Sequence, residues 1–101
     1  MKKWTLLVLI CSIFFLGFSA TAFGQDAKKL KAGFVYVGPV GDYGWSHAHD
    51  LGRKFAEEKF PWLETMIVES VSESDSARII DRLIQQQKCD VVFTTSFGYM
   101  D

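Results

Sequence analysis

The sequence is poor in cysteine, and its two cysteines, Cys11 and Cys89, lie in very different surroundings. Cys11 falls inside an apolar run near the N-terminus that we expect to be removed, which leaves Cys89 as the single cysteine of the mature chain. An internal disulfide is then excluded, and the stability of the fold must come from core packing. Because the chain also has only two histidines and no Cys/His cluster, we predict no metal site and no cofactor.

The sequence has no excess of positive charge either. Its 11 lysines and arginines face 12 aspartates and glutamates, and the formal net charge at pH 7 is −1. Because a basic face is the usual mark of nucleic-acid binding, we predict no nucleic-acid partner. If Lys2 and Lys3 are removed with the N-terminal segment, the acidic excess grows, which also disfavours binding to an anionic membrane surface.

Motifs of common catalytic and nucleotide sites are missing as well. No serine lies in a Gly-x-Ser-x-Gly elbow, and Gly38, Gly41 and Gly44 lack the spacing of a dinucleotide- or triphosphate-binding loop. His47 and His49 are two residues apart, so on a helix they would point about 200° away from each other and could not form an i, i+4 metal pair. With no evident acid/base pair, we predict no catalytic residues.

What the sequence does contain begins with a secretion signal over residues 1–24. Two lysines precede an apolar run over residues 4–18, and small residues follow, with cleavage expected after Ala22 or Gly24. The apolar run is shorter than the roughly 20 residues that span a membrane, which favours a removable signal over an anchor.

Cys11 bears on the question of lipid anchoring. It lies within the apolar run rather than at its end, without small residues before it, so we do not expect it to carry a lipid. The sequence therefore predicts a periplasmic or otherwise extracytoplasmic protein that is exported by its signal peptide.

Strand and helix patterns alternate over residues 25–101. Short runs rich in β-branched and aromatic residues indicate strands, and longer amphipathic stretches indicate helices, the first of which must end before Pro61. The order β-α-β-α-β with helical crossovers predicts a three-layer α/β domain built on a parallel sheet. The expected strands are residues 32–37, 65–71 and 89–95, and the expected helices run from Trp45 to Phe60 and over about 75–88.

Each expected helix has one apolar face. In the first helix we expect this face to pack against the sheet and the charged side chains to be solvated, with Asp50 at the surface or between helices. The apolar positions are Ala48, Leu51, Gly52, Phe55 and Ala56, and the charged ones are Arg53, Lys54, Glu57 and Glu58. The second helix carries Ala77, Ile80, Leu83 and Ile84 on one side, with Ser72 or Ser74 as its cap.

The carboxyl ends of the strands are where ligands bind in open α/β sheets. This rule selects residues 38–45, 70–75 and 96–101. Aromatic rings in the first and third segments could stack on a flat ligand, and Asp42 could accept a hydrogen bond from it.

Other interpretations of these residues stay open. Trp45 could be a packing residue between elements, and Asp42 could be a turn residue that binds its own backbone. Phe97 and Tyr99 could pack beneath a further part of the protein.

The segment from Gly38 to Arg53, with Gly-Pro-x-Gly-Asp-x-Gly-Trp followed by His-x-x-Gly-Arg, resembles the basic membrane protein (Bmp) family of ABC-transporter substrate-binding proteins. The similarity continues through residues 69–71 and 94–101. It implies the fold of a type I periplasmic binding protein, in which two α/β lobes close on a ligand. Residues 25–101 would then be the N-terminal, incomplete part of the first lobe.

The same resemblance implies a function. Family members bind purine nucleosides or nucleobases and deliver them to an ABC permease in the membrane. Carried over by position, the first loop would line the cleft and the third would form its neighbouring wall. The residues concerned are Gly41, Asp42, Tyr43, Gly44 and Trp45 in the first loop, and Ser96, Phe97 and Gly98 in the third.

Three functional hypotheses follow from the sequence. The first is a non-enzymatic solute-binding protein for a purine-type ligand. The second is an exported nucleoside-processing enzyme, which would need acidic or metal-binding groups at the strand ends. The third is a sensory domain whose cleft reports a ligand to a membrane partner.

Overall fold

A computed structural model describes residues 28–100, so the predicted signal peptide lies outside the described residues. Three strands and two helices alternate along the chain, and a short 3-10 turn follows each strand. The bounds are β1 Leu30–Val35, α2 Trp45–Lys59, β2 Leu63–Val68, α3 Ser76–Gln85 and β3 Val91–Thr94, with turns η1 Val40–Asp42, η2 Glu73–Asp75 and η3 Phe97–Tyr99.

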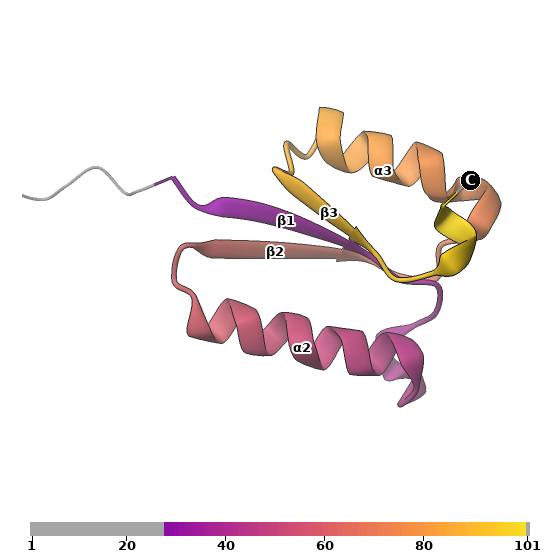
Figure 1. The fold of residues 1–101 in the computed structure, drawn as a ribbon, viewed down its shortest axis with the longest axis horizontal. Helices are drawn as coiled ribbons and strands as arrows, with labels where there is room; N and C mark the ends of the chain where they lie inside the picture. Colours follow the sequence, from indigo (N-terminus) through magenta and orange to yellow (C-terminus); the bar gives the residue numbers. More distant parts are fainter. Residues whose placement is uncertain (1–27, 101) are drawn as a thin grey trace, which may run out of the picture.

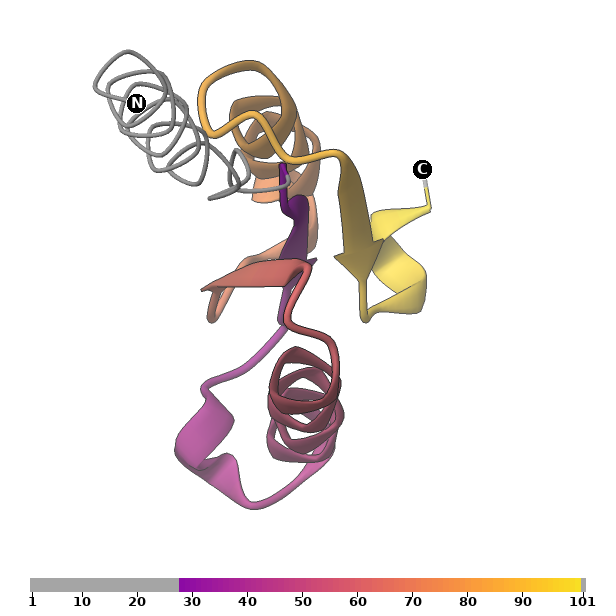
Figure 2. The same cartoon turned by 90° about the vertical axis from the view of Figure 1, so that its left-hand side faces the viewer.

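The three strands form a parallel sheet in the order β2-β1-β3. Phe34 in the central strand pairs with Ile67 on one side and with Phe93 on the other. Because the chain moves from β1 to one edge and then back across to the other edge, right-handed crossovers place α2 and α3 on opposite faces (Figures 1 and 2). The predicted three-layer parallel α/β fold is confirmed.

The apolar core lies between the sheet and α3. Gly33 permits close contact there, since an added Cβ would come within 3.2 Å of a Leu83 methyl group and 3.1 Å of the Cys89 sulfur. Burial raises the pKa of this free thiol. Ala77 and Ile84, which we expected on the apolar side of α3, are exposed, and Ile79 takes their place. The buried core residues are Val35, Val71, Ile79, Leu83, Cys89 and Tyr99.

Element ends differ from the predicted ones where single residues redirect the chain. The second strand ends at Val68 rather than at residue 71, because Ser70 takes a left-handed φ of 52°. The predicted serine caps of α3 are not formed. Ser72 donates to the Asp75 carboxylate instead, and the turn η2 precedes the helix.

The expected inner face of α2 is wrong, although Lys54, Glu57 and Glu58 are exposed as predicted. Leu51 and Phe55 are 54% and 62% exposed, whereas Ser46 and Asp50 are buried against the sheet. The sheet offers polar partners on this side: the Ser46 hydroxyl accepts from the Gly38 amide at 3.0 Å, and Tyr36 points its hydroxyl at α2. The polar stripe of α2 is therefore its inner face.

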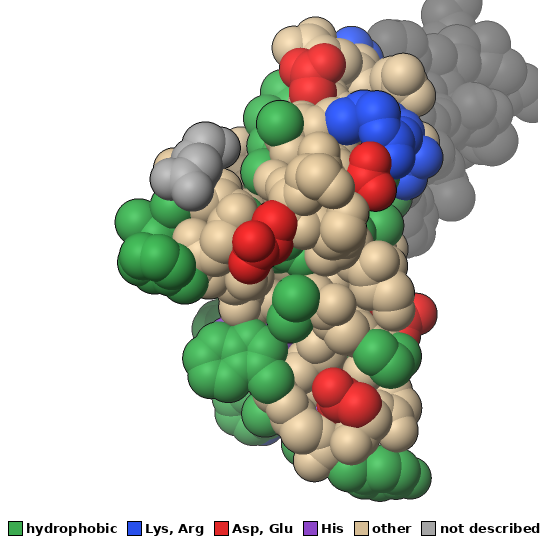
Figure 3. All heavy atoms as spheres, turned by 90° about the vertical axis from the view of Figure 1, so that its right-hand side faces the viewer, with side chains coloured by type: hydrophobic (Ala, Val, Ile, Leu, Met, Phe, Trp, Pro, Cys, Tyr) green, Lys and Arg blue, Asp and Glu red, His purple; other side chains and the backbone are tan. Residues whose placement is uncertain are grey.

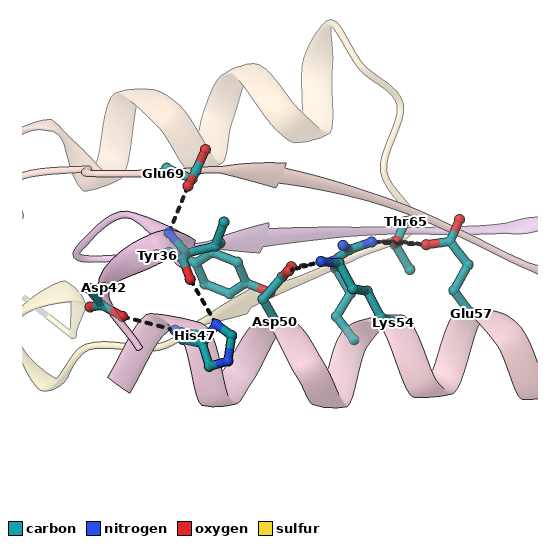
Figure 4. Close-up of polar contacts among 10 residues, drawn as sticks. Tyr36, Asp42, His47, Asp50, Lys54, Glu57, Thr65 and Glu69 are labelled. Carbon is teal, nitrogen blue, oxygen red and sulfur yellow. Dashed lines mark hydrogen bonds and ion pairs between the residues drawn. The ribbon is translucent and has the colours of Figure 1, made fainter. Parts of the chain in front are cut away.

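A polar network joins this inner face to the sheet (Figure 4). The Asp50 carboxylate accepts from the Tyr36 hydroxyl at 3.3 Å and from Arg53 Nε at 2.7 Å, and Lys54 Nζ lies 3.1 Å away. Arg53 also donates to Thr65 Oγ1 at 2.7 Å and to Glu57 Oε2 at 2.9 Å, and Thr65 donates to Glu57. Every charge that enters this interface is therefore paired.

The network shifts the titration of its members. Burial opposes the ionisation of Asp50, but the hydrogen bonds and charges of Arg53 and Lys54 outweigh it and lower the pKa of the carboxyl. Burial and the neighbouring Asp50 carboxylate raise the pKa of Tyr36 to about 12. At neutral pH the Tyr36 hydroxyl is thus a proton donor to an ionised carboxylate.

Candidate functional site

The three loops that the sequence selected meet at one end of the molecule. All strands point the same way, so the segments after β1, β2 and β3 lie together at the carboxyl ends of the strands, on the right-hand side of Figure 1. This end of the sheet is called the strand-end edge below. Figure 3 faces this edge and shows hydrophobic side chains standing out from it, with acidic side chains between them. These loops are the candidate functional site.

Asp42 organises the first loop. Its Oδ1 accepts from the Gly44 amide at 2.7 Å and from the His47 amide at 3.4 Å, so one oxygen holds both the turn and the first turn of α2. Tyr43, between Asp42 and Gly44, takes a left-handed φ of 55°. The interpretation of Asp42 as a turn residue is therefore correct, while its Oδ2 has no hydrogen-bond partner among residues 28–100.

Trp45 joins the first loop to the end of β3. Its indole Nε1 donates to the Thr95 carbonyl oxygen at 2.7 Å, and its ring meets His49 edge-on with centroids 4.8 Å apart. The residue is nonetheless 63% exposed. The hydrogen bond thus fixes one edge of the ring, and much of the ring surface is exposed to solvent. Trp45 is therefore neither a core residue nor a side chain without partners.

Tyr43 and Phe97 extend the aromatic surface. Both side chains are largely exposed, at 86% and 87%. The Tyr43 ring lies 5.0 Å from the His47 ring, and His47 Nδ1 lies 2.9 Å from the Val40 carbonyl oxygen. Exposed rings of this size next to fixed loops suit stacking on a flat ligand.

The third loop contains one core residue. Tyr99 is 7% exposed and donates its hydroxyl to the Val71 carbonyl oxygen at 2.6 Å, so it packs in the core beside α3 and not, as one interpretation had it, beneath a further part of the protein. Burial, together with the Glu73 charge, raises the pKa of this phenol. The Ser96 hydroxyl accepts from the Gly98 amide at 3.3 Å and so holds the turn.

Sequence reasoning missed two carboxylates at this edge. Glu69 Oε1 accepts from the Val40 amide at 2.7 Å and so links the second loop to the first. The Glu73 side chain lies directly against Gly98, where an added Cβ would overlap its carboxylate. The position of Glu69 just after β2 could have indicated it, but the Glu73–Gly98 contact joins residues far apart in the sequence and has no local signal.

The predicted site residues therefore fall into contacting groups. Asp42, Gly44 and Trp45 surround the start of α2, and Trp45 reaches the residue before Ser96. A Cβ added at Gly41 would have nothing within 4 Å, and Gly98 lies beside Glu73. Within residues 28–100, no group of three or more potential metal ligands is brought together, and no helix is long and apolar enough to cross a membrane.

Comparisons with known proteins match most of this chain. The family model Bmp, described as PnrA-like ABC transporter substrate-binding proteins, matches residues 29–101. A purine-binding protein of Brucella abortus is 44% identical over 87 residues, which cover 84% of this chain and 25% of that protein. A protein of Haloferax volcanii, provisionally named an ABC transporter glucose-binding protein, is 42% identical over 77 residues, covering 76% of this chain and 19% of its own length. The chain thus spans about a fifth to a quarter of these relatives.

Proposed function

Because the chain belongs to the Bmp family of PnrA-like ABC transporter substrate-binding proteins, we propose that it captures a purine nucleoside or nucleobase outside the cytoplasm for an ABC permease. Membership of the family confirms the resemblance drawn from the Gly38–Arg53 segment. The family consists of binding proteins, which favours capture over the alternative of a nucleoside-processing enzyme. The purine-binding protein of Brucella abortus supports the choice of ligand.

The observation that carries this proposal is that the Trp45 ring is both held in place and exposed. The hydrogen bond from its indole nitrogen to Thr95 fixes the ring at the strand edge, and the ring is still 63% exposed. A ring that is ordered before binding loses little conformational entropy when a ligand stacks on it. A purine could stack there, while the free Oδ2 of Asp42 accepts a hydrogen bond from a ring N–H or a sugar hydroxyl.

A sugar is the second candidate ligand. The Haloferax volcanii relative bears the name of a glucose-binding protein, and an exposed aromatic ring beside carboxylates also suits a hydroxyl-rich ring. Both ligand classes are therefore included in the test.

Isothermal titration of the protein with adenine, guanosine, inosine and glucose tests the proposal. We expect saturable binding of at least one purine. Trp45→Ala should weaken that binding by about 1–3 kcal/mol, the scale of base–aromatic stacking. Trp62→Ala is the matched control, because Trp62 is 52% exposed and lies just before β2, at the end of the sheet where the strands begin.

The outcomes separate the possibilities. Binding of glucose but no purine would replace the ligand with a sugar. Binding of purine that is unchanged in Trp45→Ala would show that Trp45 has only a packing role. Absence of heat with all four compounds would contradict the proposed ligand classes.

Export is part of the proposal and has its own test. The segment concerned, residues 1–24, lies outside the described residues. Mass spectrometry of the exported protein should give an N-terminus after Ala22 or Gly24 without an attached lipid. A mature protein that retains Met1, or one that carries a lipid on Cys11, would contradict this assignment.

A further inference from the structure

We propose that the end of the molecule where the strands begin docks on an anionic lipid membrane. The surface concerned is an open hollow lined by lysines, called the lysine hollow below, together with exposed aromatic rings beside it. It lies at the far end of the strands from the candidate ligand loops, and Figure 2 faces it. The inference takes only the exported location from the proposed function and does not depend on the ligand.

Positive charge exceeds negative charge in the lysine hollow. One of its two carboxylates is already used within the domain, because Asp90 Oδ2 accepts from the Lys31 amide at 2.9 Å and Oδ1 lies 3.8 Å from Lys28 Nζ. Among residues 28–100, the other three ammonium groups of the hollow have no ion-pair partner and can pair with lipid phosphates. The charged residues of the hollow are Lys28, Lys29, Lys31, Lys88, Glu64 and Asp90.

The acidic excess of the whole chain, which disfavours membrane binding on average, is distributed unevenly. The hollow gathers four of the chain's 11 lysines and arginines, whereas residues 36–45, 69–75 and 95–100, at the strand-end edge, contain none. A six-residue strand such as β1 is about 20 Å long, and charges beyond a Debye length of about 8 Å are largely screened at physiological salt. End-on docking therefore exposes mainly the basic end to the field of the headgroups.

Lys88 occupies a backbone position that favours glycine. It takes a left-handed φ of 58° shortly after α3, where helices commonly end on a glycine. The Lys88 side chain is exposed and lines the hollow. A lysine in this strained conformation is accounted for if its ammonium group has a use in binding.

Aromatic side chains next to the hollow favour a lipid surface over an acidic protein segment. Trp62 lines the hollow and is exposed, and its ring lies 5.1 Å from the exposed ring of Phe60. Leu30, whose amide donates to the Trp62 carbonyl oxygen at 2.8 Å, is also exposed. Tryptophan beside lysine is typical of the membrane–water interface, where the ring lies at headgroup level and the ammonium group reaches the phosphates.

The course of the chain brings this end close to the membrane during export. Lys28, in the lining of the hollow, follows the predicted signal peptide by only a few residues. Cleavage after Ala22 or Gly24 would leave a new α-ammonium group within five residues of Lys28 and add positive charge there. Docking through the hollow would keep the exported protein at the membrane without a lipid on Cys11. It would also leave the loops of the strand-end edge accessible to solute.

Cosedimentation of the mature exported protein with lipid vesicles tests the inference. We expect binding to vesicles of equal parts phosphatidylglycerol and phosphatidylcholine at low salt. This binding should weaken as ionic strength rises, and vesicles of phosphatidylcholine alone should bind little. Equal binding to the two kinds of vesicle, or no binding to either, would overturn the inference.

Two variants of the hollow and one matched control locate the contact. Lys29→Gln should weaken binding to the anionic vesicles about fivefold, the scale expected for one lysine at such a surface. Arg78→Gln removes an exposed cation near the start of α3, at the other end of the molecule, and should change binding less than about twofold. Equal effects of these two substitutions would overturn the assignment to the hollow.

Lys88→Gly separates binding from folding. It should weaken vesicle binding by about the same factor as Lys29→Gln without lowering the melting temperature, because glycine adopts a φ of 58° readily. Vesicle binding that is unchanged in Lys88→Gly would contradict a role of the Lys88 ammonium group in docking.

Tryptophan emission shows which end meets the lipid. In the chain carrying Trp4→Phe and Trp45→Phe, Trp62 is the single tryptophan, and anionic vesicles should shift its emission to shorter wavelengths as the indole leaves water. In the chain carrying Trp4→Phe and Trp62→Phe, the emission of Trp45 should not shift. A shift of Trp45 alone would place the contact at the strand-end edge and overturn the inference.

Polyglutamate distinguishes a protein partner from a membrane. A shift of Trp62 emission with polyglutamate but not with anionic vesicles would overturn the lipid in favour of an acidic protein segment. None of these measurements requires a purine. Failure of the proposed ligand would therefore leave the inference standing, and failure of vesicle binding would leave the proposed function standing.

Discussion

Asp50 shows what one buried carboxylate does in this fold. Its side chain is almost fully buried, yet it accepts from Tyr36 and Arg53 and pairs with Lys54. Arg53 is itself only 13% exposed. Asp50 is therefore the more deeply buried of the two carboxylates, Asp50 and Glu57, that neutralise Arg53 between α2 and the sheet.

We predict that Asp50→Ala lowers the free energy of unfolding by about 3–5 kcal/mol, because it leaves the Arg53 guanidinium buried without its main partner. Urea denaturation followed by circular dichroism measures the change. Asp75→Ala is the control, since its pair with Arg78 is exposed on both sides and should contribute little. Equal effects of the two substitutions would show that the network does not hold α2.

Tyr36 gives the network a pH dependence at the alkaline end. Its pKa is about 12 in the folded protein against 10.0 for an unperturbed tyrosine. The folded state thus holds the proton more tightly, so the stabilisation is complete below pH 10 and is lost as pH rises from 10 to 12. Tyr36→Phe should flatten this part of the stability profile, measured by urea denaturation at several pH values. A profile as steep as that of the wild type would assign the loss to other groups.

At the scale of elements, much of the fold could be predicted from the sequence. The change of hydrophobic period and the breakers Gly38, Pro39 and Pro61 indicate where strands and helices alternate. These are local signals. The positions of the strand ends depend on single backbone conformations, such as that of Ser70, and could be predicted only approximately.

The face of α2 that meets the sheet could not be predicted for a definite reason. Periodicity tells which residues share a face, but whether the apolar or the polar face turns inward depends on what the sheet presents. Here Tyr36 and Thr65 present hydroxyl groups, and the Asp50–Arg53 pair satisfies them. Single-sequence reasoning assumes an apolar interface and therefore chose the wrong face.

Two glycine substitutions distinguish the outer face of α2 from the core under α3. Gly52 lies on α2 with nothing within 4 Å of an added Cβ, so Gly52→Ala should stabilise the protein by about 0.5–1 kcal/mol through helix propensity. Gly33→Ala should destabilise it by about 1–3 kcal/mol, because its Cβ would press on Leu83 and Cys89.

Thermal denaturation of the two variants measures these opposite shifts. If Gly52→Ala destabilised the protein instead, the outer face of α2 would have to be covered in solution. If Gly33→Ala were neutral, the packing of α3 on β1 would be looser than the structure indicates.

At the scale of the whole molecule, the sequence located the candidate site but not its contacts. The strand-end rule and the family motif selected the loops that hold Asp42, Trp45 and Phe97. The bond from Trp45 to Thr95 and the position of Glu73 against Gly98 arise from tertiary packing between distant loops, which local patterns do not encode.

The most direct measurement is an adenosine titration of the chain carrying Trp4→Phe and Trp62→Phe, with Trp45 as the emitting residue. A purine that stacks on the exposed indole should produce a saturable change in Trp45 emission. The same titration of the chain carrying Trp4→Phe and Trp45→Phe, in which Trp62 is the single tryptophan, should produce none. Unchanged Trp45 emission together with calorimetric binding of adenosine would place the ligand elsewhere and contradict the stacking role of Trp45.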